Sequence, residues 1–469
     1  MARRPKLTEA ALAKLGAKRL AALLLAEAAK NRDLRRALQI ELDGERGVHE
    51  VVKTLTKRLT TIDNARSDLS AEKARELRSE LERIHATIIE KVGTEAPDAA
   101  LELLWRFINL HQNVLERVFD RSGAMADVFR AAVPSLGEMA ARASPSPERL
   151  AGDVMSTIMG NDYGVTDDLI PEMAEALERD GLMILQGTLL DARDQRRSAI
   201  GPEEDSTVRY DRGLARIRLA LQAVADALGD VDAFIDAQDD SDLTKPVFAS
   251  EIAIRLVAAG RAAEALAILD GAPLGDGRVG VFERRWTDAR IAALDALERG
   301  DEAQALRLAF FEKALSRDHL RAYLERLPDF EDTEAEERAL DRVADDPRFH
   351  EALWFLVHWP ALPRAARLVE ERSDRLDGDL YALLNPAAEA LEAHHPLAAA
   401  LIRRALVTFT LEHARSTRYG HAVRHIRELQ SLDTLIEDYG PHETHEMFVD
   451  RLKREHARKH SFWSRLEKT

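Results

Sequence analysis

Residues 260–269 read GRAAEALAIL, and residues 300–309 read GDEAQALRLA. In both stretches a glycine is followed five residues later by alanine, Ala265 in the first copy and Ala305 in the second, and then by leucine. Glycine lets a chain reverse direction without a Cβ penalty, and a small alanine lets a helix approach its neighbour closely. The pattern therefore predicts antiparallel helix pairs that stack along the chain.

The same register recurs further along the chain with other residues at the turn. Pro360 precedes Ala365 by the same offset, and His395 precedes Ala400. Gly420 begins a looser copy. The spacing between copies is irregular, so we expect an irregular array and not a strict repeat.

A first helix is also visible ahead of the second copy. Trp286, Ala289 and Ala293 have the spacing of one helix face packed onto a partner. A tetratricopeptide pair has a tryptophan on its first helix and a glycine, followed five residues later by alanine, at the start of its second. The stretch over about 250–435 resembles a degenerate array of such pairs. HEAT-like pairs and a plain helical bundle stay open as alternatives.

Composition supports a helical protein. The 469 residues are 45% hydrophobic and only 5% aromatic, and they carry a net charge of −16. There is no cysteine, which excludes disulfides, thiolate catalysis and cysteine zinc fingers, and which fits a cytoplasmic protein. No apolar stretch is long enough to span a membrane, and Glu27 and Lys30 interrupt the N-terminal one. The predicted fold is all-α, with an amphipathic first helix.

Two breaks suggest a division of the chain. Ser144 to Pro147 alternates serine and proline, and residues 195–207 are polar with a Gly-Pro turn. We expect an N-terminal helical bundle over residues 1–143 and a short helical region over 148–200. The tetratricopeptide-like α-solenoid with a basic C-terminal helix would then occupy 205–469.

Histidines gather near the end of the chain, where seven of the fifteen lie from His413 onward. His421 and His425 are four residues apart on a predicted helix, a spacing that places two imidazoles on one metal ion. His425 also belongs to an apolar series with Ile426, so a packed core histidine is the preferred interpretation. We therefore assign no metal, no cofactor and no catalytic residue.

An acidic turn and a basic tail are the other candidate sites. Gly160 to Gly164, with Asp167 and Asp168, could offer oxygen ligands to a cation, but a turn that leads into a helix near Leu169 is preferred. The C-terminus interleaves cations with two aromatic residues, a pattern shared by nucleic-acid sites, protein interfaces and helices docked on a core. The interaction surface predicted from the sequence consists of Tyr419, His421, Arg424, Arg458, Lys459 and Trp463.

Six longer stretches have distinctive sequences. They are LxxLGAKRLAALLL over 12–25, LLWRFINL over 103–110, HLRAYLERLPDFEDTEAEERALD over 319–341, FHEALWFLVHWPALPRAARLV over 349–369, LNPAAEALEAHHPLAAALIRRALVTFTLEHARSTRYGHAVRH over 384–425 and LKREHARKHSFW over 452–463. Together they resemble a bacterial family of unknown function over nearly the whole chain. The C-terminal half is also similar to the helical region that follows a SWIM zinc finger, although the cysteines of that finger are missing. The resemblance implies an all-α, repeat-like, cytoplasmic protein and does not imply an enzyme.

We therefore expect a non-catalytic cytoplasmic scaffold or adaptor that binds a protein or peptide partner. A basic groove would favour an acidic partner or a C-terminal carboxylate. Two alternatives stay open: a nucleic-acid-associated protein that uses the basic termini, and a metal-dependent enzyme that uses the C-terminal histidines. Homo-oligomers are also left open, and no membrane association is expected.

Overall fold

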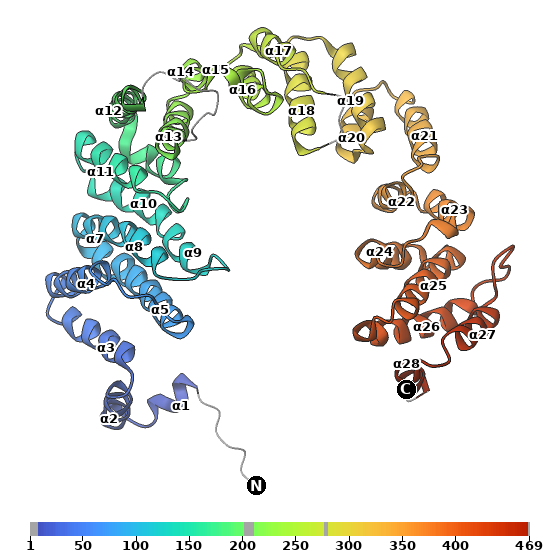
Figure 1. The fold of residues 1–469 in the computed structure, drawn as a ribbon, viewed down its shortest axis with the longest axis horizontal. Coiled ribbons are helices and arrows are strands. Elements are labelled where there is room, and N and C mark those ends of the chain that lie inside the picture. The colour runs from blue at the N-terminus through green and yellow to red at the C-terminus, as the bar shows by residue number, and fades with distance from the viewer. Residues whose placement is uncertain (1–7, 201–210, 276–279, 468–469) are drawn as a thin grey trace. The chain divides into compact units, whose positions relative to one another are not determined.

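The computed structural model describes residues 8–200, 211–275 and 280–467. Every regular element in these residues is a helix, which confirms the all-α prediction. Contacts divide the chain into two compact units, Met1–Asp242 and Leu243–Thr469 (Figure 1). The Ser144–Pro147 break lies inside the first unit, and part of the break predicted over 195–207 lies outside the described residues.

The helices of the first unit range in length from 3 to 32 residues. They are α1 (Glu9–Ala13), α2 (Ala17–Ala28), α3 (Arg32–Gly44), α4 (Val48–Asp63), α5 (Ala71–Thr87), the π-helical turn η1 (Ile88–Val92), α6 (Gly93–Glu95), α7 (Pro97–Asn109), α8 (His111–Glu116), α9 (Ala124–Arg130), α10 (Val133–Ala143), α11 (Pro147–Met159), α12 (Leu169–Ile200), α13 (Arg212–Leu228) and α14 (Val231–Asp236). Helix α15 (Asp240–Leu243) spans the division between the units.

Helix α7 shows how the sequence builds the core of this unit. Leu101, Leu104, Trp105 and Ile108 follow the spacing of one helix face, and all four are buried in the core. Pro97 occupies the first turn of the helix, where its missing N–H costs nothing because that donor would have no partner in the helix. The amphipathic pattern thus places one face of α7 against α4 and α10.

The second unit continues with helices that pack in chain order. They are α16 (Pro246–Ala258), α17 (Ala262–Gly271), α18 (Val281–Ala296), α19 (Gly300–Ala314), α20 (Arg317–Leu324), α21 (Glu331–Ala344), α22 (Phe349–His358), α23 (Leu362–Glu371), η2 (Ser373–Arg375), α24 (Tyr381–Leu391), α25 (Pro396–Glu412), η3 (Ser416–Arg418), α26 (Tyr419–Asp433), α27 (His445–Glu455) and α28 (His460–Glu467).

The helix pairs of the second unit share a turn geometry. The N–H of Arg261 donates to the carbonyl oxygen of Leu256 at 2.8 Å, and the N–H of Arg299 donates to Leu294 at 3.0 Å. A third such bond joins Ala361 to the residue five positions earlier at 2.9 Å. Bonds of this span close the end of a helix in a Schellman motif. The same backbone hydrogen bond therefore recurs at three of the turns where the sequence predicts that two helices are joined.

The hydrogen bonds across the two turns align the second copy two residues earlier than the sequence pattern predicts. Gly260 has a left-handed φ of +76°, and its counterpart two residues before Gly300 is Glu298, with φ of +58°. Gly300 is instead the first residue of α19. Ala305, the alanine that the sequence pattern predicts in contact with the neighbouring helix, is exposed, whereas Ala303 is buried.

One alanine position is common to the second helices of four pairs. The residue four positions after the N-cap is alanine in α17, α19, α23 and α25, and each of these side chains is 0% exposed. These residues are Ala265, Ala303, Ala365 and Ala399. A fully buried small side chain at this position lets each second helix approach its neighbours. Of the predicted alanines, Ala305 is exposed, whereas Ala400, one residue after Ala399, is also buried.

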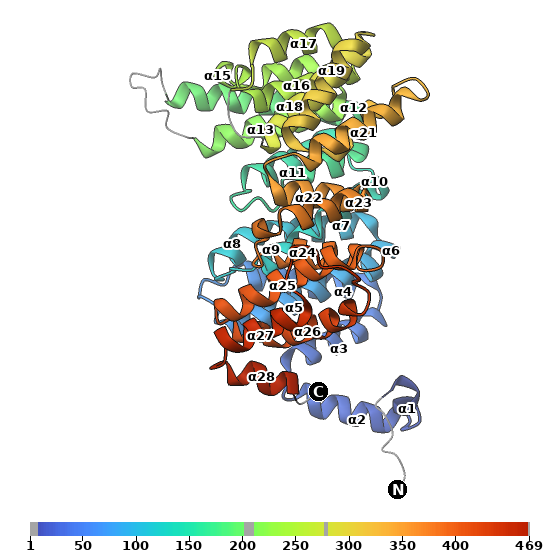
Figure 2. The same ribbon diagram turned by 90° about the vertical axis from the view of Figure 1, so that its right-hand side faces the viewer.

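Neighbouring pairs stack in two rows. Helix α22 contacts α24 in one row, and α23 contacts α25 in the other. Figures 1 and 2 both show α22, α24, α26 and α28 following one another through this part of the unit. A continuous core runs between the rows from Phe311 to Phe462. No helix in the described part of the chain is long and apolar enough to cross a membrane.

Candidate functional site

The predicted C-terminal surface is only partly exposed. His421 and Arg424 lie on the exposed side of α26. Tyr419 does not belong to that surface, because its side chain is only 6% exposed and its ring meets the ring of Phe462 edge-on. The tyrosine therefore helps to hold α28 against α26, which corrects its predicted place on the interaction surface.

The basic and aromatic C-terminal tail also contains both buried and exposed residues. Phe462 is fully buried, and the indole Nε1 of Trp463 donates to the carbonyl oxygen of His456 at 3.0 Å. Arg458 is exposed and Lys459 is half-buried. The aromatic pair thus docks the last helix on the core, while Arg458 faces solvent.

His421 and His425, the two histidines predicted to be four residues apart on one helix, have different environments. His425 lies against Glu428, with 2.9 Å between Nδ1 and Oε2, and the buried guanidinium of Arg403 contacts both residues. Burial lowers the pKa of the His425 imidazole, and the Glu428 carboxylate opposes that effect. His421 is exposed. Among the residues that the structure describes, no group of three or more acidic or histidine side chains is placed to hold a metal ion.

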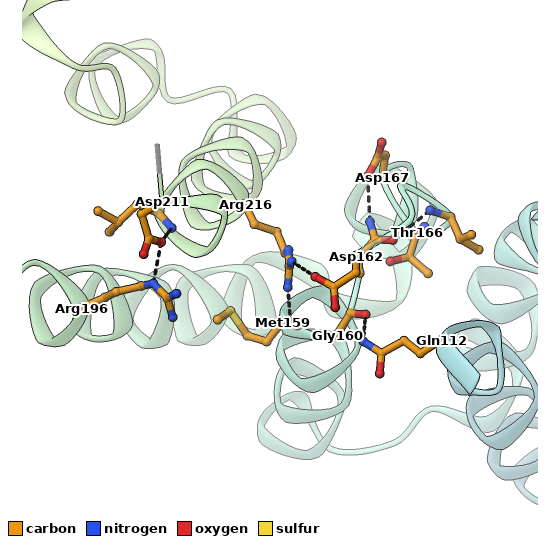
Figure 3. A network of polar contacts seen from close by, with 12 residues as sticks. Gln112, Met159, Gly160, Asp162, Thr166, Asp167, Arg196, Asp211 and Arg216 are labelled. Atoms are coloured by element: carbon orange, nitrogen blue, oxygen red, sulfur yellow. Dashed lines mark hydrogen bonds and ion pairs between the residues drawn. The ribbon is translucent and has the colours of Figure 1, made fainter. Parts of the chain in front are cut away.

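The acidic turn after α11 is held by hydrogen bonds within the protein (Figure 3). The side chain of Arg216 donates to the carbonyl oxygen of Met159 and to Asp162, the latter at 2.6 Å. The amide of Asn161 donates to Asp167 at 2.7 Å, and its oxygen accepts from the N–H of Val165. Helix α12 then begins at Leu169, as the sequence predicts. These carboxylates therefore join α11, α12 and α13.

A different surface of the second unit combines exposed aromatic residues with cations. Trp354 on α22 is 40% exposed and Tyr381 at the start of α24 is 51% exposed, although both residue types are usually covered. We define the Trp354 surface as Arg317, His350, Trp354, His358, Tyr381 and Arg418.

The aromatic residues of this surface are held in place by their neighbours. The rings of Trp354 and His358 lie 3.6 Å apart, and Nδ1 of His358 donates to the carbonyl oxygen of Trp354 at 2.8 Å. The guanidinium of Arg418 lies 4.5 Å from the centre of the Tyr381 ring and donates to Asp379 at 3.0 Å. Rings fixed in this way lose little entropy when a partner binds.

Two hollows lie along α22 and share the residues His350 and Glu351, and Trp354 lines the first of them. The first has a volume of about 330 Å³ and lies between α20, α22 and α24. The second, of about 440 Å³, extends from the start of α22 to Arg375. Hollows of this size beside an exposed tryptophan can receive individual side chains of a partner.

The charges around the hollows are unevenly paired. Arg317 and Arg375 line different hollows, and in the described residues neither has a carboxylate within ion-pair distance. Burial lowers the pKa of His350, and its Nε2 accepts a hydrogen bond from the N–H of Asp377 at 3.2 Å, which requires an unprotonated Nε2. The guanidinium groups of Arg317 and Arg418 supply positive charge to the Trp354 surface.

The sequence analysis missed this surface. Trp354 lies in an apolar run between Ala352 and Val357, so the run suggests a helix buried on all sides. The overlooked signal is the spacing of His350, Trp354 and His358, which recurs every four residues and marks one helix face that interrupts the apolar run. The arrangement offers aromatic contacts and guanidinium donors, which are groups for binding.

Comparison with known protein families gives a match over nearly the whole chain. The chain belongs to the family described as "Family of unknown function (DUF6880)", whose model matches residues 2–465. This result confirms the resemblance to a family of unknown function over nearly the whole chain. No curated protein matches the chain.

Proposed function

We propose that the chain is a non-catalytic, cytoplasmic helical-repeat scaffold, related to tetratricopeptide arrays, that binds a protein or peptide partner through the Trp354 surface. The observation that carries the proposal is the exposure of Trp354 and Tyr381 on neighbouring helices, with Trp354 lining a hollow. Tryptophan, tyrosine and arginine dominate the binding energy of protein interfaces.

The charges indicate the chemistry of the partner. Arg317 and Arg375 can each donate two hydrogen bonds to one carboxylate. The partner we propose is a peptide segment that places an apolar or aromatic side chain against Trp354 and carboxylates near the arginines. An acidic side chain or a free C-terminus supplies such carboxylates.

Capture on the immobilised full chain tests the proposal. We would compare the wild type with a Trp354→Ala/Tyr381→Ala double variant, and use Phe119→Ala, an exposed aromatic of the first unit, as the matched control. Circular dichroism of each variant would establish that the helical content is unchanged. We expect a protein partner that survives nuclease treatment, that binds the control and that is lost on the double variant.

Two other results would contradict the proposal in distinct ways. Recovery of nucleic acid that both variants retain, with binding that falls steeply between low and moderate salt, would favour the nucleic-acid alternative. Stoichiometric metal in the purified protein, lost on His421→Ala, would favour the metal-dependent enzyme. A partner that binds the double variant as well as the wild type would move the interface away from the Trp354 surface.

A further inference from the structure

A groove of about 520 Å³ lies in the first unit, apart from all the residues of the Trp354 surface. Helices α3, α4 and α5 and the turn η1 all line it. The volume falls in the range of ligand pockets, and three surrounding helices give the shape of a cradle for an elongated segment.

Ion pairs hold the groove open from both sides. Arg36 on α3 donates to Glu80 on α5 at 3.0 Å, and Arg58 on α4 binds the same carboxylate through two bonds of 2.6 Å. Further along, Lys91 donates to Glu41 on α3 at 2.5 Å. These side chains span the space between the helices that line the groove.

The interior of the groove is apolar. Ala37 and Ile40 line it from α3, Leu55 from α4, and Ile84 and Ala86 from α5. Leu55 and Ile84 are buried, while Ala86 is exposed toward the opening. An apolar side chain that enters the groove therefore leaves water and contacts hydrocarbon, which is favourable.

The charges that line the groove are mainly positive. Five cations face it, whereas only Glu41, Glu80 and Glu90 contribute carboxylates, in a chain whose net charge is −16. Lys57 on α4 has no ion-pair partner within the described ranges. The cations that line the groove are Arg36, Lys57, Arg58, Arg83 and Lys91.

We infer that this groove binds an acidic amphipathic helix of a partner protein. The helix would place apolar side chains, three or four residues apart, against Ala37, Ile40 and Ala86, and its carboxylates would lie beside Lys57. A basic helix is disfavoured, because it would bring like charges to the groove. The site is separate from the Trp354 surface and stands whether or not that surface binds a partner.

Fluorescence anisotropy with two synthetic peptides of about four helical turns tests this inference on the full chain. Both peptides carry leucines with the same spacing, and the remaining positions are glutamates in one and lysines in the other. We expect the glutamate peptide to bind, and its affinity to fall as salt increases. Binding of neither peptide, or equal binding of both, would overturn the inference.

Two variants place the peptide in the groove. Ala86→Trp fills the opening and Lys57→Glu reverses a lining charge, and we expect each to weaken binding about tenfold or more. Ala71→Trp and Lys73→Glu, on exposed positions of α5 outside the groove, are the matched controls and should leave binding unchanged. Thermal unfolding of each variant would establish that the chain is folded.

Equal binding by the groove variants and the controls would place the peptide elsewhere and overturn the inference. Competition with decanoate separates a peptide site from a site for a small amphiphile. Tight binding of decanoate that Ala86→Trp abolishes, without binding of the glutamate peptide, would assign the groove to an amphiphile and also overturn the inference. A failure here leaves the outcome of the Trp354 and Tyr381 experiment unaffected, because that surface lies in the other unit.

Discussion

The backbone N–H of Arg299 donates to the carbonyl oxygen of Leu294 at 3.0 Å, across the turn between α18 and α19. The same bond closes the turn between α16 and α17, where Gly260 occupies the left-handed position. The corresponding residue of the later turn is Glu298, with φ of +58°. A residue with a Cβ atom is strained in this conformation, whereas glycine is not.

Replacing Glu298 with glycine should therefore stabilise the protein. We expect Glu298→Gly to raise the free energy of unfolding by about 1 kcal/mol, because it removes the left-handed strain. Urea unfolding followed by circular dichroism measures the change. Gly300→Ala is the control: Gly300 begins a helix and an added Cβ meets no atom within 4 Å, so this variant should be neutral or slightly stabilising. If Gly300→Ala lowered the free energy of unfolding, the result would instead support the register predicted from the sequence, in which Gly300 occupies the turn.

Gly378 is a second position where backbone geometry makes a prediction. A Cβ atom there would lie 2.3 Å from the carbonyl oxygen of Ala405 and 2.5 Å from Cβ of Phe409. Gly378→Ala should therefore lower the free energy of unfolding by about 1–3 kcal/mol, because the loop before α24 would have to move away from α25. Gly271→Ala, with open space around the added atom, is the control in the same unfolding experiment. Equal stability of the two variants would contradict the close approach.

The buried Arg403 predicts a further loss of stability. Its guanidinium binds Glu392 and Glu428 and contacts His425, and the side chain is almost fully buried. Arg403→Met should cost about 2–3 kcal/mol, because it removes hydrogen bonds between charged groups and leaves the acceptors without their donor. Chemical unfolding measures the loss, and Arg424→Met at an exposed position of α26 should change stability little. A similar loss in both variants would argue against the network.

His111 predicts a pH dependence of stability. Burial lowers the pKa of its imidazole below the unfolded value of about 6.5, while Nδ1 donates to the carbonyl oxygen of Ile108 at 2.7 Å. Between the two pKa values the unfolded chain binds more protons than the folded one. The contribution of His111 to stability is thus complete above pH 6.5 and is lost as the pH falls toward the lower folded pKa.

Unfolding free energies measured at pH 7.5 and pH 5 test this sign. The wild type should lose more stability on acidification than His111→Gln, which has no imidazole to protonate at that position. Thr60→Gln, at an exposed position of α4, changes no titratable group and should show the same pH dependence as the wild type. An unchanged pH dependence in His111→Gln would show that the buried imidazole contributes nothing to it.

Local sequence patterns predicted the helices well. The face formed by Leu101, Leu104, Trp105 and Ile108 is buried as its spacing requires, and α12 begins at the expected Leu169. These features depend on residues three or four positions apart, which one helix brings together by itself. The candidate site was predicted less well, since Tyr419 proved to be buried and the partly exposed Trp354 was not among the predicted site residues.

The sequence by itself determined that the chain forms paired helices with small residues between them, because helix periodicity and turn chemistry are local properties. Only the tertiary structure decided which residue occupies each turn and which aromatic side chains face solvent. Glu298 adopts a conformation suited to glycine because the packing of α18 against α19 fixes the turn around it. Burial likewise depends on neighbours far apart in the chain: the ring of Phe462 meets that of the buried Tyr419, whereas Trp354 is 40% exposed.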